Sequence, residues 1–379
     1  MERQRDAEPR DGLRPGAPPR GRADGRVRPA ALARRRAAVL GGLVAALLLT
    51  LLTGIGVGAV DLPPARVVGL LWDALTRGGA GGDAAARILL EIRLPRVLLA
   101  ALVGASLASA GASFQALFRN PMADPYVLGV SGGGALGAAL AFYALNAAGA
   151  GLPAADALGF GLVPVCAFAG AVAAVSVVGR LAQVNGRMPV TTLLLAGVAV
   201  AALLGAIVSL LVYLSGDQMR PLVFWLLGSL SGASWRDVAV VAVSTAVGTG
   251  LLAREVRALN ALLTGEEPAY HLGVDVEGLK RRLLVAGSLL TATAVSVSGV
   301  IGFVGLIVPQ AVRLVVGGDH RIVVPASTLA GAAVLVLCDT VARTVIAPAE
   351  LPVGVVTALA GAPFFLYLLR SHASGGMSL

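Results

Sequence analysis

Charged residues are scarce in this chain of 379 residues, at 13% of the total, whereas soluble domains average about 25%. Hydrophobic residues make up 57%, and apolar runs of about 20 residues recur along almost the whole length. Glycine is abundant, and Gly129, Gly133 and Gly137 stand four apart, a spacing that suits close helix packing. The composition excludes a soluble globular protein, and the short alternating segments of a transmembrane barrel do not occur. We predict an all-α polytopic membrane protein.

Metal-binding and catalytic patterns are also missing from the sequence. Cys166 and Cys338 lie in apolar runs without metal or disulfide spacing, so we interpret them as small core residues. His271, His320 and His372 are isolated, and none is expected to be a ligand. No nucleotide-binding G-x-x-x-x-G-K-[ST] motif, H-E-x-x-H motif or G-x-S-x-G motif occurs. We therefore predict no catalytic residue, no resident metal and no cofactor.

Titratable groups deep in the predicted spans are few. The deepest acid, Asp339, precedes Arg343 by four residues, so the two side chains can pair on one helix face. A proton-driven pump needs titratable groups along its pathway. A stand-alone secondary transporter and a membrane-embedded enzyme are therefore remote alternatives. The energy for any transport is expected from a partner.

The apolar runs give ten candidate spans. The eighth is short for a full crossing, which leaves a partial or a tilted helix open. A further apolar piece, 221–230, is too short to cross and is expected at the membrane interface, with Trp225 and Trp235 as anchors. The ten spans are 37–60, 97–117, 125–146, 157–179, 190–214, 235–252, 283–301, 303–316, 322–347 and 351–369.

The first 36 residues differ from the rest, with eleven arginines against five acidic residues. We predict a disordered cytoplasmic tail over 1–36, a transmembrane domain over 37–370 and a short tail over 371–379. Ten spans from a cytoplasmic start place both termini in the cytoplasm. The basic tail is expected to lie against anionic membrane lipid rather than nucleic acid.

Most of the remaining positive charge falls in loops that this topology places in the cytoplasm, as the positive-inside rule predicts. The segment 61–96 is the exception, because the topology places it outside the membrane. Its arginines need a local explanation, or the topology is wrong. They are Arg66, Arg77, Arg87, Arg93 and Arg96.

The largest internal loop, about 253–282, contains the signal of a helix of about two turns. Thr264 and Glu267 have capping-box spacing, although Pro268 makes the N-cap uncertain, and Gly273 suits the C-terminal stop. From the residues alone, two interpretations stay open. The helix rests on its own protein, or it docks a cytoplasmic partner.

Several long motifs, in order, resemble the permeases of the FecCD/BtuC type, which are membrane subunits of importers for iron–siderophores, haem and vitamin B12. The resemblance begins at RLPRVLLAALVGASLASAGASFQALFRNPMADPYVLGVSGGGALGA (93–138) and covers about residues 38–370. It continues through TTLLLAGVAV (191–200), FWLLGSLSGASW (224–235), LNALLTGEEPAYHLGVDV (259–276), GVIGFVGLIVPQAVRL (299–314) and DTVARTVIAPAELPVGVVTALAGAPFFLYLL (339–369).

The resemblance implies ten transmembrane helices in the inner membrane and two permease copies, identical or not, around a central pathway. It also implies two cytoplasmic ATPase subunits and an extracytoplasmic substrate-binding protein. The expected cargo is a metal chelate, with iron(III)–siderophore first and cobalamin or haem as alternatives. The segment that would contact the ATPase includes Leu259, Thr264, Gly265, Glu266, Glu267, Ala269, Leu272 and Gly273.

The resemblance also assigns the outer arginines. Arg93, Arg96 and Arg343 would receive acidic residues of the binding protein, because guanidinium groups pair bidentately with carboxylates. The alternative is that Arg343 only pairs with Asp339 and that the other two hold lipid phosphates.

Two further stretches bear on the pathway. Val190, Thr191 and Thr192 match the cytoplasmic gate, although Pro189 and Thr191 could simply begin a helix. Many relatives carry histidine where this chain has Gln310, and no metal role is inferred there.

Overall fold

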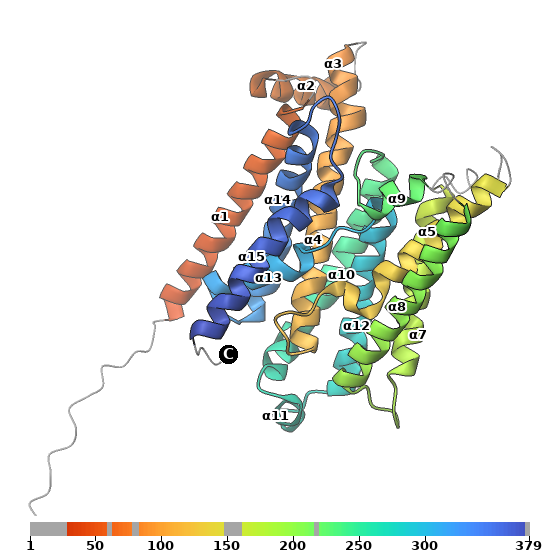
Figure 1. Cartoon of the computed structure of the whole chain (residues 1–379). Helices are drawn as coiled ribbons and strands as arrows, with labels where there is room; N and C mark the ends of the chain where they lie inside the picture. Colours follow the sequence, from red (N-terminus) through yellow and green to blue (C-terminus); the bar gives the residue numbers. More distant parts are fainter. Residues whose placement is uncertain (1–28, 59–62, 78–82, 148–160, 216–219, 376–379) are drawn as a thin grey trace, which may run out of the picture.

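The computed structural model describes residues 29–58, 63–77, 83–147, 161–215 and 220–375 (Figure 1). Within these ranges the chain forms helices joined by turns and loops and contains no β-strand. The pair Val184 and Arg187 makes a single isolated bridge across a tight turn. The all-α prediction is confirmed.

Ten helices in the described part of the chain correspond to the ten predicted spans. Seven are long and apolar enough to cross a membrane, while α13 has 13 residues, or a length of about 20 Å, against about 30 Å for a bilayer core. The eighth segment therefore does not cross as a helix by itself. The ten are α1 (Pro29–Gly56), α4 (Leu94–Leu117), α5 (Val130–Ala147), α7 (Leu162–Leu181), α8 (Val190–Ser215), α10 (Trp235–Leu262), α12 (Val276–Ser298), α13 (Val304–Val316), α14 (His320–Thr344) and α15 (Val353–Gly375).

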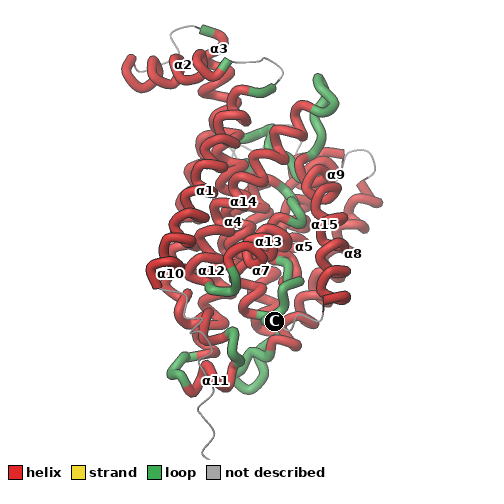
Figure 2. The backbone as a smooth tube through the Cα atoms, turned by 90° about the vertical axis from the view of Figure 1, so that its left-hand side faces the viewer, coloured by secondary structure: helices red, strands yellow, loops and turns green. Residues whose placement is uncertain are grey.

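Short elements mark the two ends of the bundle. At one end lie α2 (Pro64–Arg77) and α3 (Ala84–Arg87), and at the other lies α11 (Glu266–His271), as Figures 1 and 2 both show. We call these the α2 end and the α11 end. The first residues of α1 and the C-terminus lie toward the α11 end (Figure 1). The described chain thus begins and finishes on the same side of the bundle.

Helix α4 occupies the centre of the bundle and packs against α14, α12, α10 and α13. Glycines permit this close packing of α4. A Cβ on Gly104 would overlap the carbonyl of Gly331 on α14, and a Cβ on Gly111 would overlap the carbonyl of Gly305 on α13. The same holds for Gly133 and Gly137 of α5, which face carbonyls of α7. Their predicted role in close packing is confirmed. Gly129 instead has a φ of +78° and ends the short helix η2 (Pro125–Leu128).

Several predicted boundaries were wrong. Helix α1 begins at Pro29, so 29–36 is not a disordered tail: Arg35 donates to the carbonyl of Val315 at 2.9 Å, and Arg36 lies 2.6 Å from Asp319. At the other terminus, α15 continues to Gly375 beyond the predicted tail boundary at 371. Residues 1–28, 59–60, 157–160 and 376–379 of the predicted segments lie outside the described residues.

The predicted loop 253–282 is also shorter than expected. Helix α10 continues to Leu262 and α12 already begins at Val276, so the connection reduces to 263–275. Polar residues at these helix ends made them resemble a loop, but they lie beyond the apolar core, where a helix tolerates charge.

Candidate functional site

A π-helical turn at the α2 end, η1 (Ile88–Arg93), leads directly into α4. Pro95 has no N–H to donate to the carbonyl of Glu91, and its ring crowds that carbonyl. The turn widens in response, so that the N–H of Leu94 donates to Leu89, five residues back. Arg93 is the last residue of this widened turn and Arg96 lies in the first turn of α4, and both side chains are buried.

Arg96 lies between two carboxylates. Its Nε and Nη2 atoms are 3.0 and 2.9 Å from Oδ1 of Asp339, and its Nη1 is 3.1 and 2.9 Å from the two carboxylate oxygens of Glu350. Asp339 also lies 3.0 Å from Nε of Arg343, which confirms the predicted pair on α14. The contacts to Arg96 and Glu350 join α4, α14 and the loop before α15.

The other two guanidinium groups hold the end of α1. Arg93 Nη1 donates to the carbonyls of Ile55 and Gly56 at 3.1 and 3.2 Å, and Arg343 Nη2 donates to the carbonyl of Gly54 at 2.9 Å. The last carbonyls of a helix lack helical partners and carry partial negative charge. The arginines at the α2 end therefore cap α1 as well as binding carboxylates.

The three arginines are largely buried in the single chain, with exposed fractions of 5% for Arg93, 7% for Arg96 and 8% for Arg343. Arg96 faces both carboxylates, Asp339 and Glu350, and Arg343 faces Asp339. Among these groups the Glu350 side chain is the most exposed, at 43%. The structure thus brings together the three residues expected to dock a partner, and it adds Glu350, a more exposed partner of Arg96 that the sequence reasoning missed.

The predicted helix of the connecting segment is α11, one and a half turns long. Gly265 precedes it with a φ of +125° and without a side-chain cap, and Thr264 donates to the carbonyl of Ala261 instead. The predicted capping box between Thr264 and Glu267 was therefore wrong. Gly273, with a φ of +83°, ends the segment as predicted, and the N–H of Val274 donates to the carbonyl of Ala269.

The side chains of this segment divide between two environments. Ala269 and Leu259 are fully buried against the bundle, whereas Tyr270 and Leu272 are 69% and 70% exposed. Large apolar side chains exposed together beside Glu267 are typical of a protein contact surface rather than of a helix resting on its own chain. This surface lies at the α11 end, beyond the apolar part of the bundle (Figure 1).

A buried lysine joins this segment to the beginning of α8. Lys280 Nζ lies 2.7 Å from Glu266 of α11 and 3.1 Å from Glu277 of α12, and it donates to the carbonyl of Met188 at 3.2 Å. The N–H of Met188 in turn donates to Glu277 at 2.8 Å. Lys280 is 2% exposed. No sequence motif pointed to it, because only the fold brings Met188 and Glu266 to the same cation.

The predicted gate residues lie immediately beyond this contact. A tight turn with positive φ at Asn185 and Gly186 reverses the chain, and α8 then begins at Val190. Thr191 is exposed on the first turn, and Val190 and Thr192 are partly buried. The gate residues therefore stand at the α11 end, two to four residues after the backbone that Lys280 and Glu277 hold.

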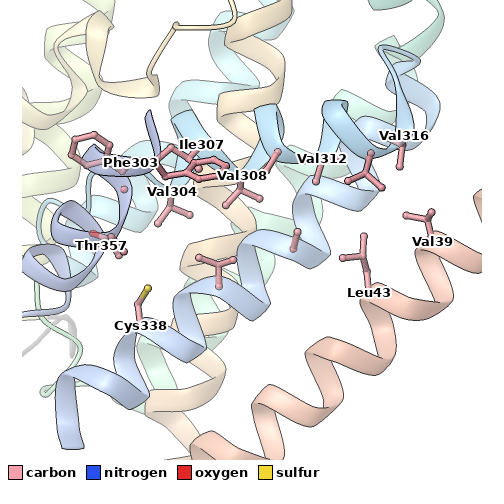
Figure 3. Close-up of a pocket in the computed structure, with 17 residues that line it drawn as sticks. Val39, Leu43, Phe303, Val304, Ile307, Val308, Val312, Val316, Cys338 and Thr357 are labelled. Atoms are coloured by element: carbon pink, nitrogen blue, oxygen red, sulfur yellow. The ribbon is translucent and has the colours of Figure 1, made fainter. Parts of the chain in front are cut away.

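An apolar cavity of about 470 Å³ lies between α1, α13, α14 and α15 (Figure 3). Figure 3 shows Phe303 and Ile307 on one wall and Val39 and Leu43 on the other. Its lining contains no charged group, and Thr357 and Cys338 are its polar members. Such a lining offers little to a charged metal chelate, so the cavity is not a candidate substrate site.

The sequence matches the FecCD transport family over residues 46–371. The chain belongs to this family. Among relatives, the cobalamin import system permease BtuC of Halobacterium salinarum is 51% identical, with 80% of each chain covered. The hemin transport system permease HmuU of Yersinia pestis is 42% identical, over 89% of this chain and 97% of the relative.

Solved structures agree with this assignment. A metal-chelate type ABC transporter in an inward-facing conformation has a TM-score of 0.74 and 29% identity, over 88% of this chain and 99% of the other. PsaBC of Streptococcus pneumoniae shares only the fold, at 16% identity and a TM-score of 0.50. This member of the FecCD family is thus a multi-pass membrane permease subunit of an ABC importer and not an enzyme. ATP hydrolysis in such systems belongs to a separate subunit.

Proposed function

We propose that this permease translocates a metal chelate across the cytoplasmic membrane, with both termini in the cytoplasm. In this scheme a binding protein delivers the cargo at the α2 end, and two ATPase subunits bind the α11 end. The observation that carries the proposal is the shared cation Lys280, which connects the exposed contact surface of α11 to the predicted gate. A second copy, identical or different, completes the pathway.

The relatives favour a tetrapyrrole cargo. The sequence alone favoured iron(III)–siderophore, whereas the relatives at 51% and 42% identity are named for cobalamin and hemin import. We therefore place cobalamin first, haem second and iron(III)–siderophore third. Binding of each compound to the cognate extracytoplasmic receptor decides among them, because in this scheme the receptor selects the cargo.

Docking of the binding protein is proposed at Arg93, Arg96 and Arg343. Their burial changes how this would occur, because an incoming carboxylate meets Glu350 before it reaches Arg96. We infer an exchange in which an acidic side chain of the binding protein takes the place of Glu350. Guanidinium groups pair bidentately with such a carboxylate, and opposed charges would speed the encounter.

At the α11 end, closure of the ATPase pair would move α11 through Tyr270 and Leu272. Glu266 would carry this displacement to Lys280, and Lys280 to the backbone of Met188. A small tilt of α8 then changes the position of Thr191 at the proposed constriction. Such coupling needs an element with two arrangements that both ends influence, and the first turn of α8 would be that element.

Reconstitution in vesicles tests the proposal. Uphill uptake of the cargo should require the ATPase, ATP and the loaded binding protein together. Accumulation driven by a proton or sodium gradient without the ATPase would instead establish the secondary-transporter alternative and overturn the importer.

A further inference from the structure

A second cavity is separate from the apolar cavity of Figure 3 and shares no lining residue with it. It measures about 680 Å³ and lies between α10 and α14. Ala246, Gly250 and Ala253 of α10 leave room along one wall, because none has a side chain larger than a methyl group. Val324, Pro325 and Leu329 of α14 form the opposite wall. The shape is an apolar groove bounded by two helices.

Two guanidinium groups stand at one end of this groove. Arg257 lies near the end of α10 and Arg321 at the beginning of α14, and the groove lining contains no acidic residue. Neither guanidinium has an ion pair or a hydrogen bond within the described ranges. The acid nearest to Arg321 in sequence, Asp319, is engaged by Arg36 at 2.6 Å and by Asn260 at 2.8 Å. The acid nearest to Arg257, Glu255, is engaged by Arg282 at 2.7 Å.

The depth of the groove matches one leaflet of a bilayer. On α10, the helix between Ala246 and Arg257 rises by eleven residues, or about 17 Å. On α14, the helix between Arg321 and Leu329 rises by eight residues, or about 12 Å. Half of a bilayer core measures about 15 Å. The guanidinium groups therefore lie at headgroup level when the apolar walls lie among acyl chains.

The surroundings of the groove are those of a lipid-facing surface. Val243 and Val247 of α10, which lie beside Ala246 and Gly250, are 65% and 49% exposed. An apolar surface of this kind on a membrane helix faces acyl chains. An apolar groove that ends in two unpaired guanidinium groups has the composition of a phospholipid site, in which the arginines hold the phosphate.

We propose that the groove between α10 and α14 binds an anionic phospholipid, with its headgroup phosphate at Arg257 and Arg321 and one acyl chain along Ala246, Gly250 and Ala253. This proposal requires only membrane insertion and is independent of the transported cargo. A lipid held there would bridge the helix that leads into α11 and the helix that carries Asp339 and Arg343.

The test uses the purified full chain in detergent, titrated with phosphatidylglycerol or with phosphatidylcholine of the same acyl chains. Native mass spectrometry counts the retained lipids. We expect retention of phosphatidylglycerol over phosphatidylcholine, and about 25-fold weaker retention in the Arg257→Gln/Arg321→Gln variant, from about fivefold per basic residue. Arg180→Gln, which removes an exposed charge from the end of α7, is the matched control and should change little.

A second variant tests the groove without changing its charge. No atom lies within 4 Å of a Cβ added to Gly250, so Gly250→Leu folds and fills the groove. It should weaken retention at least tenfold, while Gly205→Leu, equally open on α8, should not.

Three results of the lipid titration overturn the proposal. They are equal retention of the two lipids, unchanged retention in both the double-arginine variant and Gly250→Leu, and full competition by soluble glycerol phosphate, which would show a free-phosphate site. Loss of a dimer, rather than of lipid, on Gly250→Leu would identify a second copy of the chain as the occupant and would equally overturn it.

Discussion

Replacing Lys280 by methionine removes the cation that links α11 to α8 while keeping the length of the side chain. Three contacts are lost together: the pair with Glu266 at 2.7 Å, the pair with Glu277 at 3.1 Å and the hydrogen bond to the carbonyl of Met188 at 3.2 Å. The N–H of Met188 keeps its bond to Glu277. The variant therefore separates α11 from the gate without dismantling the start of α8.

The stability cost of this change is modest. The Glu266 side chain is 44% exposed, so that pair contributes about 0.2–1 kcal/mol, and the Glu277 pair, 29% exposed, about 1 kcal/mol. The unpaired carbonyl of Met188 costs about 1 kcal/mol more. Burying methionine instead of an ammonium group offsets part of this loss. We expect a net loss of about 2 kcal/mol, which lowers the unfolding temperature by only a few degrees.

The functional cost should be larger than the stability cost. Coupling free energies between sites are typically about 1–3 kcal/mol, or 5- to 150-fold. We expect the number of cargo molecules moved per ATP hydrolysed to fall at least tenfold in reconstituted vesicles, while the ATPase still binds through Tyr270 and Leu272. Lys280→Arg should restore part of the ratio, and Arg180→Met, which removes an exposed cation at the end of α7, should leave it intact.

One result would refute the reasoning about Lys280. If Lys280→Met folds, binds the ATPase and transports with the ratio of the unmodified protein, the cation is structural only. Co-purification with the ATPase and a thermal unfolding curve on the same sample distinguish this outcome from simple misfolding.

Three further predictions concern the two ends of the bundle. Reversing charge in Arg93→Glu/Arg96→Glu should weaken docking of the binding protein at least tenfold in a binding assay and also destabilise the chain, and unchanged affinity would remove the proposed outer site. Glu350→Gln should strengthen docking severalfold if Glu350 competes for Arg96, so weaker docking would argue against the exchange. Burial alone would raise the pKa of Asp319, but the N–H of Arg321, the amide of Asn260 and the charges of Arg36 and Arg321 lower it overall. Its stabilising contribution should therefore be complete above pH about 4 and be lost as the pH falls through the lowered pKa. Acid titration of unfolding should show this loss in the parent and not in Asp319→Asn.

The fold was largely predictable because its determinants are local. Apolar runs of about 20 residues specify spans, and the glycines at Gly133 and Gly137 indicated a close helix contact that the structure contains. Boundaries failed where helices extend beyond the apolar core, as α10 does through 253–262. Hydropathy predicts only the part of a helix that lies in the apolar bilayer core, whereas helical hydrogen bonding continues beyond that core.

The site was predictable only where its parts lie close in sequence. Asp339 and Arg343 are one turn apart, so their pair follows from spacing. The contact between Arg96 and Glu350 joins residues 254 positions apart, and that between Lys280 and Met188 joins residues 92 apart. No periodicity encodes such contacts, and only the packing of α4, α12 and α14 creates them.

The burial of the outer arginines links the two ends of the molecule. Arg93 and Arg343 hold the end of α1, and Arg96 holds α14 through Asp339, so a partner that draws Arg96 outward must also loosen these helices. At the opposite end, Asp319 is the N-cap of α14 and contacts Arg36 of α1 and Asn260 of α10. Docking on one face would therefore act on the same helices that anchor the other. A docking event that reached Arg96 without changing the mobility of the α14 start would show that the two ends act separately.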